Sequence, residues 1–151
     1  MTSPHILVVG GAGYIGSHMV KMLAAQGYTV TTLDNLSTGY RDAVVGGDFI
    51  HADLADRPAL DRLFAEKQFD AVMHFASFIQ VGESVREPAK YYENNVTNTL
   101  NLLDAMVARG IQRFIFSSSA AVYGDPHTVP IPEDHSKDPI NPYGRTKWIV
   151  E

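Results

Sequence analysis

A glycine-rich segment between an apolar run and an amphipathic stretch constrains the fold of this chain more than any other feature. Residues 10–16 are Gly-Gly-Ala-Gly-Tyr-Ile-Gly and contain both GxxGxxG and GxGxxG. The apolar run 6–9 before them is typical of a strand buried on both faces of a parallel sheet. After them, apolar residues recur at helical spacing as far as Gly27: Ile15, Met19, Met22 and Leu23. A strand, a glycine bend and a helix in this order predict a pyrophosphate site at the helix end, rather than a glycine turn without a ligand.

Strand and helix signals alternate along the rest of the chain. Further strands are predicted at 29–33, 49–50, 71–75 and 114–116. One helix is predicted after Pro58, with the stripe Leu60, Leu63 and Phe64, and another before Gly110, with the stripe Val96, Leu100, Leu103 and Met106. Such alternation requires right-handed crossovers with helices on both faces of the sheet. The sequence therefore predicts an α/β fold with a doubly wound parallel sheet, the three-layer αβα Rossmann fold.

The proline-rich segment 124–142 interrupts this alternation. It contains five prolines and predicts a loop over the carboxyl edge of the sheet, after which Asn141 can cap a helix that Pro142 opens. The length fits one domain, which we expect to span residues 1–151. A complete doubly wound domain normally has a sixth strand. We therefore expect the sequence to be a fragment of a longer protein, with the sixth strand and the substrate-binding part beyond it.

Composition narrows the class of ligand. The chain has 17 acidic and 12 basic residues, a net charge of −5, so it has no basic field to bind nucleic acid or anionic lipid. It has no cysteine, and no two histidines have metal-binding spacing, so no metal is expected. The apolar run 6–9 is too short for a signal or a membrane span. A cytoplasmic location is the default expectation.

An acidic residue at the end of the second predicted strand indicates which dinucleotide is bound. Asp34 follows Gly16 by eighteen residues, close to the spacing at which an acid hydrogen-bonds the adenosine ribose. A carboxylate there repels a 2′-phosphate, which favours NAD over NADP. The alternative is a turn aspartate in the segment 34–37.

Two further patterns suggest chemistry. Tyr143 and Lys147 are four residues apart on the predicted last helix, where a nearby ammonium and the helix N-terminus both stabilise a phenolate. The three serines 117–119 end the fifth predicted strand, where ligands of open α/β sheets bind. One hydroxyl can orient a substrate oxygen, while at least one of the three is expected to cap loop backbone. An isolated YxxxK match would more often be two exposed helix residues. Because Tyr143 and Lys147 follow a Rossmann pattern and the serines, they are catalytic candidates.

In combination and in order, these segments resemble the UDP-glucose 4-epimerases, a family of extended short-chain dehydrogenases/reductases. The resemblance rests on the glycine loop and on residues 34–36, 53–54, 74–76, 81–85, 91–96, 117–124 and 143–147. It implies interconversion of UDP-glucose and UDP-galactose through transient oxidation at C4 by bound NAD. It also implies a UDP-hexose as partner, and a homodimer in which the helix 91–109 is the candidate contact.

The resemblance implies a role for each matching residue. The implied catalytic residues are Ser119, Tyr143 as the base, and Lys147. The implied cofactor-binding residues are Gly10, Gly13, Tyr14, Ile15 and Gly16 at the pyrophosphate, Asp34 and Asn35 at the adenosine ribose, Asp53 and Leu54 at the adenine, Phe75 and Ala76 at the nicotinamide, and Asn95, Ser117, Tyr143 and Lys147 at the cofactor end of the pocket.

Two departures from related patterns matter. Residues 78–80 are Phe-Ile-Gln, where some epimerases place a lysine that touches the cofactor. Ala120 and Ala121 follow the serines, where related 4,6-dehydratases have Asp-Glu, which favours an epimerase over a dehydratase. A dehydratase or reductase of the same family stays an alternative. A non-catalytic NAD-binding module is the alternative from a different class.

Overall fold

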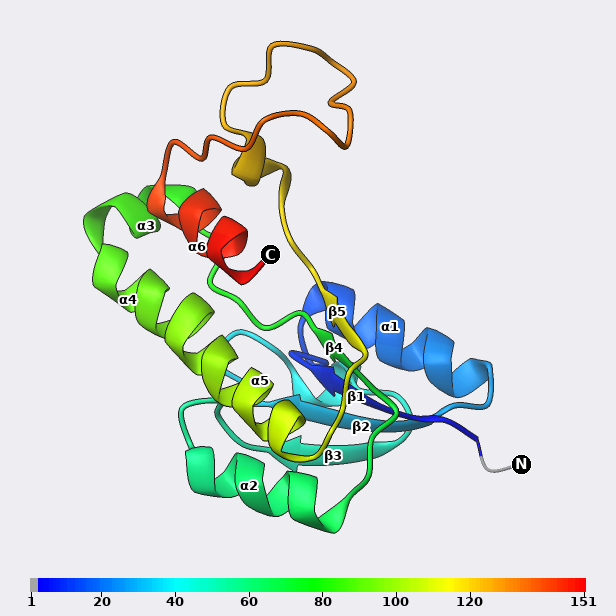
Figure 1. Cartoon of the computed structure of the whole chain (residues 1–151). Coiled ribbons are helices and arrows are strands. Elements are labelled where there is room, and N and C mark those ends of the chain that lie inside the picture. Colours follow the sequence, from blue (N-terminus) through cyan, green and yellow to red (C-terminus); the bar gives the residue numbers. More distant parts are fainter. Residues whose placement is uncertain (1–2) are drawn as a thin grey trace. The chain divides into compact units, whose positions relative to one another are not determined.

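A single parallel sheet organises the first part of the structure, a computed structural model that describes residues 3–151. Within those residues the sheet has five strands in the order β3-β2-β1-β4-β5 (Figure 1). The strands are β1 (His5–Val9), β2 (Thr29–Asp34), β3 (Asp48–His51), β4 (Ala71–His74) and β5 (Phe114–Phe116). All are parallel, with Val8 of β1 beside Thr32 on one side and Met73 on the other. The predicted strands and the doubly wound order are confirmed.

Helices cover both faces of this sheet, as Figure 1 shows. Because strand residues alternate between faces, Leu7 and Val9 pack on one side and Ile6 and Val8 on the other. The first side is covered by α2 (Arg57–Glu66) and α5 (Asn98–Ala108), the second by α1 (Tyr14–Ala25). The three layers predicted from the alternation of elements are therefore present.

Helix α2 confirms its predicted stripe, whereas α1 confirms Met19 and Leu23, which lie against or in the core, but not Ile15 and Met22. On α2 the buried residues are the predicted stripe Leu60, Leu63 and Phe64. On α1 the buried residues are Gly16, Val20 and Leu23, whereas the predicted Ile15 and Met22 are 57% and 49% exposed. The reason is Gly16: without a side chain it lets α1 approach the bend closely, and this turns Ile15 toward solvent.

The long helical segment 88–108 contains an irregularity that the sequence pattern did not predict. Helix α4 (Pro88–Tyr92) continues through a π-helical turn (Glu93–Thr97) into α5. A π-turn holds an extra residue and rotates the following face of the helix. Leu102 is fully buried, while Leu100, which the predicted stripe places in the core, is 54% exposed. Two other positions of the predicted stripe are confirmed, because Met106 is buried in the core and Leu103 packs against it.

The chain forms two compact units. The first comprises Met1–Ala76 with Asn101–Ser117 and holds the sheet; the second comprises Ser77–Leu100 with Ser118–Glu151. The second contains α3 (Val81–Arg86), α4, a 3₁₀ turn (Ala120–Tyr123) and α6 (Pro142–Val150). The proline-rich segment before α6 contains no helix or strand, as predicted. Between residues 3 and 151 no helix is long and apolar enough to cross a bilayer, and no cluster of His, Asp and Glu could hold a metal ion.

The rotated face of α5 can be tested with two leucines on the same helical segment. Leu102→Ala is expected to lower the free energy of unfolding by about 2–5 kcal/mol, because it opens a cavity in the core. Leu100→Ala is expected to change it by less than about 1 kcal/mol, because the side chain is half exposed. Urea unfolding measures both, and equal losses would place the buried stripe where the regular helical pattern puts it.

Candidate functional site

The glycine bend between β1 and α1 is fixed by backbone packing. Gly10 has φ +79°, and a Cβ there would lie 2.5 Å from the backbone nitrogen of Ala76. A Cβ on Gly16 would overlap the carbonyl oxygen of Gly10. The amide of Gly10 donates to the carbonyl of Leu33 at 2.8 Å, which ties the bend to β2. Glycine at 10 and 16 is therefore required by the fold itself.

Gly13 differs, because the fold leaves space around it. A Cβ at Gly13 would meet only the Gly10 carbonyl oxygen at 3.4 Å, an ordinary contact, and its φ is −78°. As the N-cap of α1, Gly13 has no side chain to accept from the helix-end amides, and the first turn has no acidic residue. Tyr14 is 83% exposed. The N-terminus of α1 is therefore an open, uncapped helix end with room for an anion in front of it.

Asp34 lies beside this bend, as its spacing predicted. Its Oδ2 accepts from the amide of Ala12 at 2.9 Å, and its Oδ1 accepts from the amide of Leu36 at 2.8 Å. The second bond is the turn geometry of the alternative interpretation, with Leu36 at φ +58°. Each carboxylate oxygen has a further lone pair, so the same group can close the turn and accept from a ribose hydroxyl.

The other predicted adenosine residues lie on the same edge of the first unit. Nδ2 of Asn35 donates to Oδ2 of Asp53 at 2.6 Å, and the amide of Ala55 holds Oδ1 of Asp53 at 2.8 Å. Leu54 is buried in the core on the α2 side, so its side chain contributes packing. The structure thus brings Asn35 and Asp53 together.

The predicted nicotinamide residues follow β4. The amide of Phe75 donates to the carbonyl of Val9 at 2.8 Å, and Ala76 is the backbone neighbour of Gly10. The amide of Ser117 donates to the carbonyl of His74 at 3.1 Å, which prolongs the pairing of β4 with β5. These residues therefore lie at the carboxyl ends of the strands, the edge where α/β sheets bind ligands.

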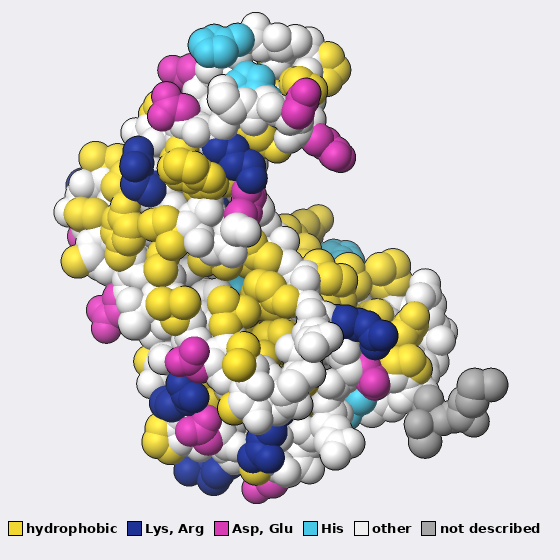
Figure 2. Space-filling model, in the orientation of Figure 1, with side chains coloured by type: hydrophobic (Ala, Val, Ile, Leu, Met, Phe, Trp, Pro, Cys, Tyr) yellow, Lys and Arg dark blue, Asp and Glu magenta, His cyan; other side chains and the backbone are white. Residues whose placement is uncertain are grey.

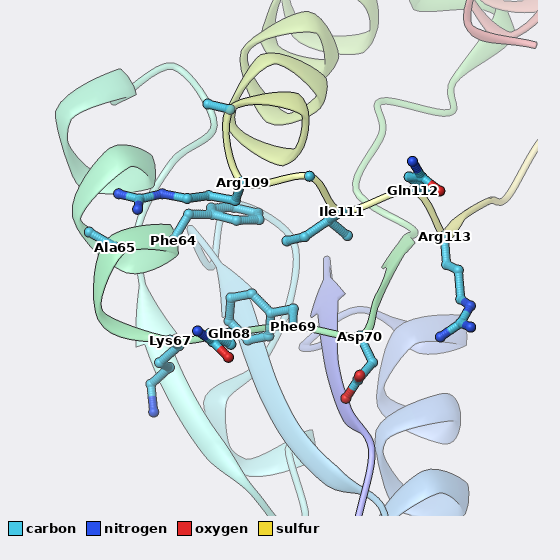
Figure 3. A pocket seen from close by; sticks show the side chains of 12 residues that line it. Phe64, Ala65, Lys67, Gln68, Phe69, Asp70, Arg109, Ile111, Gln112 and Arg113 are labelled. Atoms are coloured by element: carbon cyan, nitrogen blue, oxygen red, sulfur yellow. The ribbon is translucent and has the colours of Figure 1, made fainter.

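A cavity of about 720 Å³ in the first unit lies at the other end of the strands, where β4 and β5 begin (Figure 3). It is lined by the end of α2 and the turn into β4, and by the end of α5 and the turn into β5. These turns lead into the amino ends of the strands, whereas the glycine bend follows a carboxyl end. This cavity is therefore separate from the predicted dinucleotide site.

In the second unit, α6 begins as predicted at Asn141 and Pro142. Oδ1 of Asn141 accepts from the amide of Gly144 at 2.8 Å. A Cβ on Gly144 would lie 2.5 Å from the carbonyl oxygen of Ala121, so the helix passes directly against the 3₁₀ turn that follows Ser119. This close approach places the start of α6 beside the serine-bearing segment.

The Tyr143 and Lys147 pair is buried on one side of α6. Nζ of Lys147 lies 5.9 Å from the centre of the Tyr143 ring, and Lys147 is only 4% exposed. Burial lowers the pKa of Lys147 from 10.5 to about 8. The amine of Lys147 is therefore still mostly protonated at neutral pH.

Ser119 combines a capping role with a free proton. Its Oγ accepts from the amide of Ala121 at 3.2 Å and caps the 3₁₀ turn. The neighbouring Ser118 donates to the carboxylate of Glu151. The expected backbone-capping serine is thus Ser119 itself, whose hydroxyl can also donate its hydrogen to a substrate oxygen.

Asn95, in the π-helical turn, holds several backbone segments together. Its Oδ1 accepts from the amide of Phe78 at 2.9 Å, and its Nδ2 donates to the carbonyl of Phe78 at 3.0 Å and to Oγ1 of Thr146 at 3.1 Å. The sequence predicts only a cofactor contact for Asn95. Its amide also links the segment after Ala76 to α6, and no sequence signal indicated the part played by Thr146. The cofactor contact of Asn95 stays a prediction.

A parallel sheet in this order with an open helix end after β1 defines the Rossmann class of dinucleotide-binding folds. The chain belongs to the NAD dependent epimerase/dehydratase family, whose model matches residues 6–151. It is 53% identical over 151 residues to the UDP-glucose 4-epimerase of Rhizobium meliloti (strain 1021), covering 100% of this chain and 46% of that protein. It is 47% identical over 157 residues to the probable UDP-arabinose 4-epimerase 3 of Oryza sativa subsp. japonica, covering 97% and 39%.

Solved structures of epimerases have the same fold as this chain. The crystal structure of UDP-glucose 4-epimerase from Brucella ovis in complex with NAD matches with a TM-score of 0.95 at 52% identity, over 98% of this chain and 46% of that one. The Stenotrophomonas maltophila UDP-glucose-4-epimerase with bound NAD and formylated UDP-arabinopyranose matches with a TM-score of 0.93 at 41% identity, over 97% and 46%. The chain spans about half the length, or less, of the curated relatives it matches.

Two glycine substitutions separate the fold from ligand binding. Gly16→Ala is expected to lower the free energy of unfolding by about 1–3 kcal/mol, because its Cβ meets rigid backbone. Gly13→Ala is expected to change it by less than about 1 kcal/mol, yet to weaken NAD binding at least about tenfold by filling the space before the helix end. Thermal unfolding and calorimetry measure the two effects, and unchanged NAD affinity in Gly13→Ala would contradict this account of the bend.

Burial of Lys147 predicts a pH dependence of stability. The folded-state pKa, about 8, lies below the ordinary 10.5, so between these values the unfolded chain binds more protons and stability rises with pH. Lys147→Met is expected to abolish this rise and to increase stability at pH 7, at about 1.4 kcal/mol per unit of pKa. Urea unfolding from pH 7 to 10.5 tests this, and the same rise in the variant would assign it to another group.

Proposed function

We propose that the protein is an NAD-dependent nucleotide-sugar 4-epimerase that interconverts UDP-glucose and UDP-galactose. The observation that carries this proposal is the buried pair of Tyr143 and Lys147 one turn apart on α6. A tyrosine becomes a useful base near neutral pH when a cation stabilises its phenolate, and this burial strengthens that interaction. Relatives named UDP-glucose 4-epimerase at 50–53% identity support the same reaction.

The residues of the first unit suit NAD. The amides at the start of α1, at Tyr14, Ile15 and Gly16, would hold the pyrophosphate. Asp34 and Asn35 would hydrogen-bond the hydroxyls of the adenosine ribose. The space in front of Gly13 is the cradle that fits the phosphates, because a side chain there would fill it.

The remaining cofactor contacts are proposed from the family match and the sequence resemblance. Asp53 and the backbone at Leu54 would flank the adenine, and Phe75 and Ala76 would line the nicotinamide. Asn95 and Ser117 complete the proposed set with Tyr143 and Lys147. Bound NAD would supply a reversible hydride acceptor for C4 of the sugar.

The chain's own groups would carry the proton. Tyr143, as phenolate, would take the proton of the sugar 4-hydroxyl, directly or through Ser119. Lys147 holds the phenolate by its charge. Oxidation at C4 would give a 4-keto sugar, and C4 would be inverted if hydride returned to the opposite face of that carbon while Tyr143 returned the proton to the 4-oxygen. The nucleotide must therefore stay anchored while the hexose turns.

The residues after Ser119 argue against dehydration. A 4,6-dehydratase needs a carboxyl group to protonate the departing hydroxyl, and the 3₁₀ turn instead begins with Ala120 and Ala121. We therefore favour epimerisation. UDP-arabinose is a second candidate substrate, since a relative at 47% identity is named for it.

We further propose that the protein acts as a homodimer, through the helix 91–109. Figure 2 shows hydrophobic side chains gathered over the region of α3, α4 and α6. The exposed hydrophobic side chains on the helices of the second unit include Val85, Leu100 and Ile149. A cytoplasmic location stays a prediction.

Tyr143→Phe in the full-length protein tests the role of the phenol. Turnover of UDP-galactose is expected to fall roughly 10²–10⁴-fold, because the general base is lost, while calorimetry shows that NAD still binds, with an affinity no more than about tenfold weaker. Tyr28→Phe, the same change on a tyrosine outside the proposed site, is the control and should stay fully active. More than a small fraction of activity in Tyr143→Phe would refute the role. A stable 4-keto-6-deoxy product would indicate a dehydratase, and NAD binding without turnover in the wild type would indicate a non-catalytic module.

A further inference from the structure

Ser84 is a buried polar residue for which the proposed reaction leaves no role. It lies on α3 within the segment Val81–Val85 that contributes to the sequence resemblance, and it is 0% exposed. Its Oγ donates to the carbonyl of Val81 at 2.7 Å and accepts from the backbone amide of Tyr143 at 3.2 Å. Because its hydrogen is committed to α3, the hydroxyl presents a lone pair to α6.

This contact completes the capping of the helix that carries the phenol. The first residue of α6, Pro142, has no N–H. The third amide, of Gly144, donates to Asn141 at 2.8 Å, and the second, of Tyr143 itself, donates to Ser84. The amides of Tyr143 and Gly144 therefore both have an acceptor, and Pro142 needs none. The acceptor for Tyr143, Ser84, comes from outside α6.

Helix α3 is itself held rigidly. Oε1 of Glu83 pairs with Nζ of Lys90 at 2.6 Å, and Oε2 accepts from the hydroxyl of the fully buried Tyr91 at 2.7 Å. The Tyr91 oxygen also accepts from the amide of Gln80 at 3.0 Å. Burial, with the nearby carboxylate, raises the pKa of Tyr91 to about 12, so it remains a donor throughout the neutral range. Ser84 therefore lies on a helix that is held in place by its contacts with α4.

We propose that Ser84 is a positioning residue, whose hydroxyl fixes the backbone of Tyr143 and so sets where the phenol oxygen lies. The proposal rests on the proposed function, because it requires Tyr143 to be the base. Ser84 acts through the first turn of α6 and need not touch the substrate. Loss of its acceptor frees the amide of Tyr143 and lets the first turn shift, and a shift of about 1 Å can cost roughly 10²-fold in rate.

Ser84→Ala and Ser84→Cys in the full-length protein test this. Alanine removes the acceptor, and cysteine is slightly larger than serine but accepts hydrogen bonds only weakly. Both are expected to lower kcat for UDP-galactose about 10- to 100-fold, with KM and NAD affinity within about threefold of wild type. Leu63→Val, which removes core volume in the other unit, is the control for stability and should keep its kcat.

The outcomes separate this proposal from the proposed function. Wild-type kcat in both Ser84 variants, with Tyr143→Phe inactive, overturns the positioning role alone. A loss of kcat no greater than that of Leu63→Val at the same change in melting temperature also overturns it. If Tyr143→Phe is itself active, the proposed function fails, whatever the Ser84 variants do.

Discussion

The tightest constraint in this structure is the contact of three backbone segments at the end of β1. The Gly10 backbone faces that of Phe75 and Ala76 with no space for a Cβ, and Gly16 packs directly on the Gly10 carbonyl. These contacts fix the direction in which α1 leaves the sheet. They also place the start of α1 at the carboxyl ends of the strands, just after Ala12, whose amide donates to Asp34. The proposed cofactor site depends on this packing before any side chain contributes.

The two helix N-termini that matter for function are finished in opposite ways. Gly13 leaves the end of α1 without a capping side chain, so its amides remain available to an anion. In α6, Pro142, Asn141 and Ser84 account for the first turn. The first helix end is suited to holding a diphosphate, whereas the second holds a side chain in place. The two helix ends thus differ in whether their first amides are paired: those of α1 are left for a ligand, whereas those of α6 are bonded within the protein.

Much of this follows from local sequence. The apolar runs predicted all the strands, and Asn141 with Pro142 predicted the start of α6, because these signals act within a few residues. On α5 the pattern placed Leu103 and Met106 correctly, but it could not show that Leu102 is buried and Leu100 exposed. These two residues follow a π-helical turn whose Asn95 is bonded to Phe78 and Thr146, and local sequence does not reveal such distant contacts. Nor could the contact of Ser84 with Tyr143, 59 residues apart, which only the folded chain creates. The YxxxK spacing indicated the pair but not that Lys147 is buried.

The most direct test of the account is to locate the diphosphate of the cofactor by NMR. Oxidised NAD would be titrated into ¹⁵N-labelled protein while the backbone amide resonances are followed. The account predicts that the amides of Tyr14, Ile15 and Gly16 show the largest shifts, because they would donate to the phosphates. Shifts confined to the turns 67–70 and 109–113, at the opposite edge of the sheet, or no shifts at all, would contradict it.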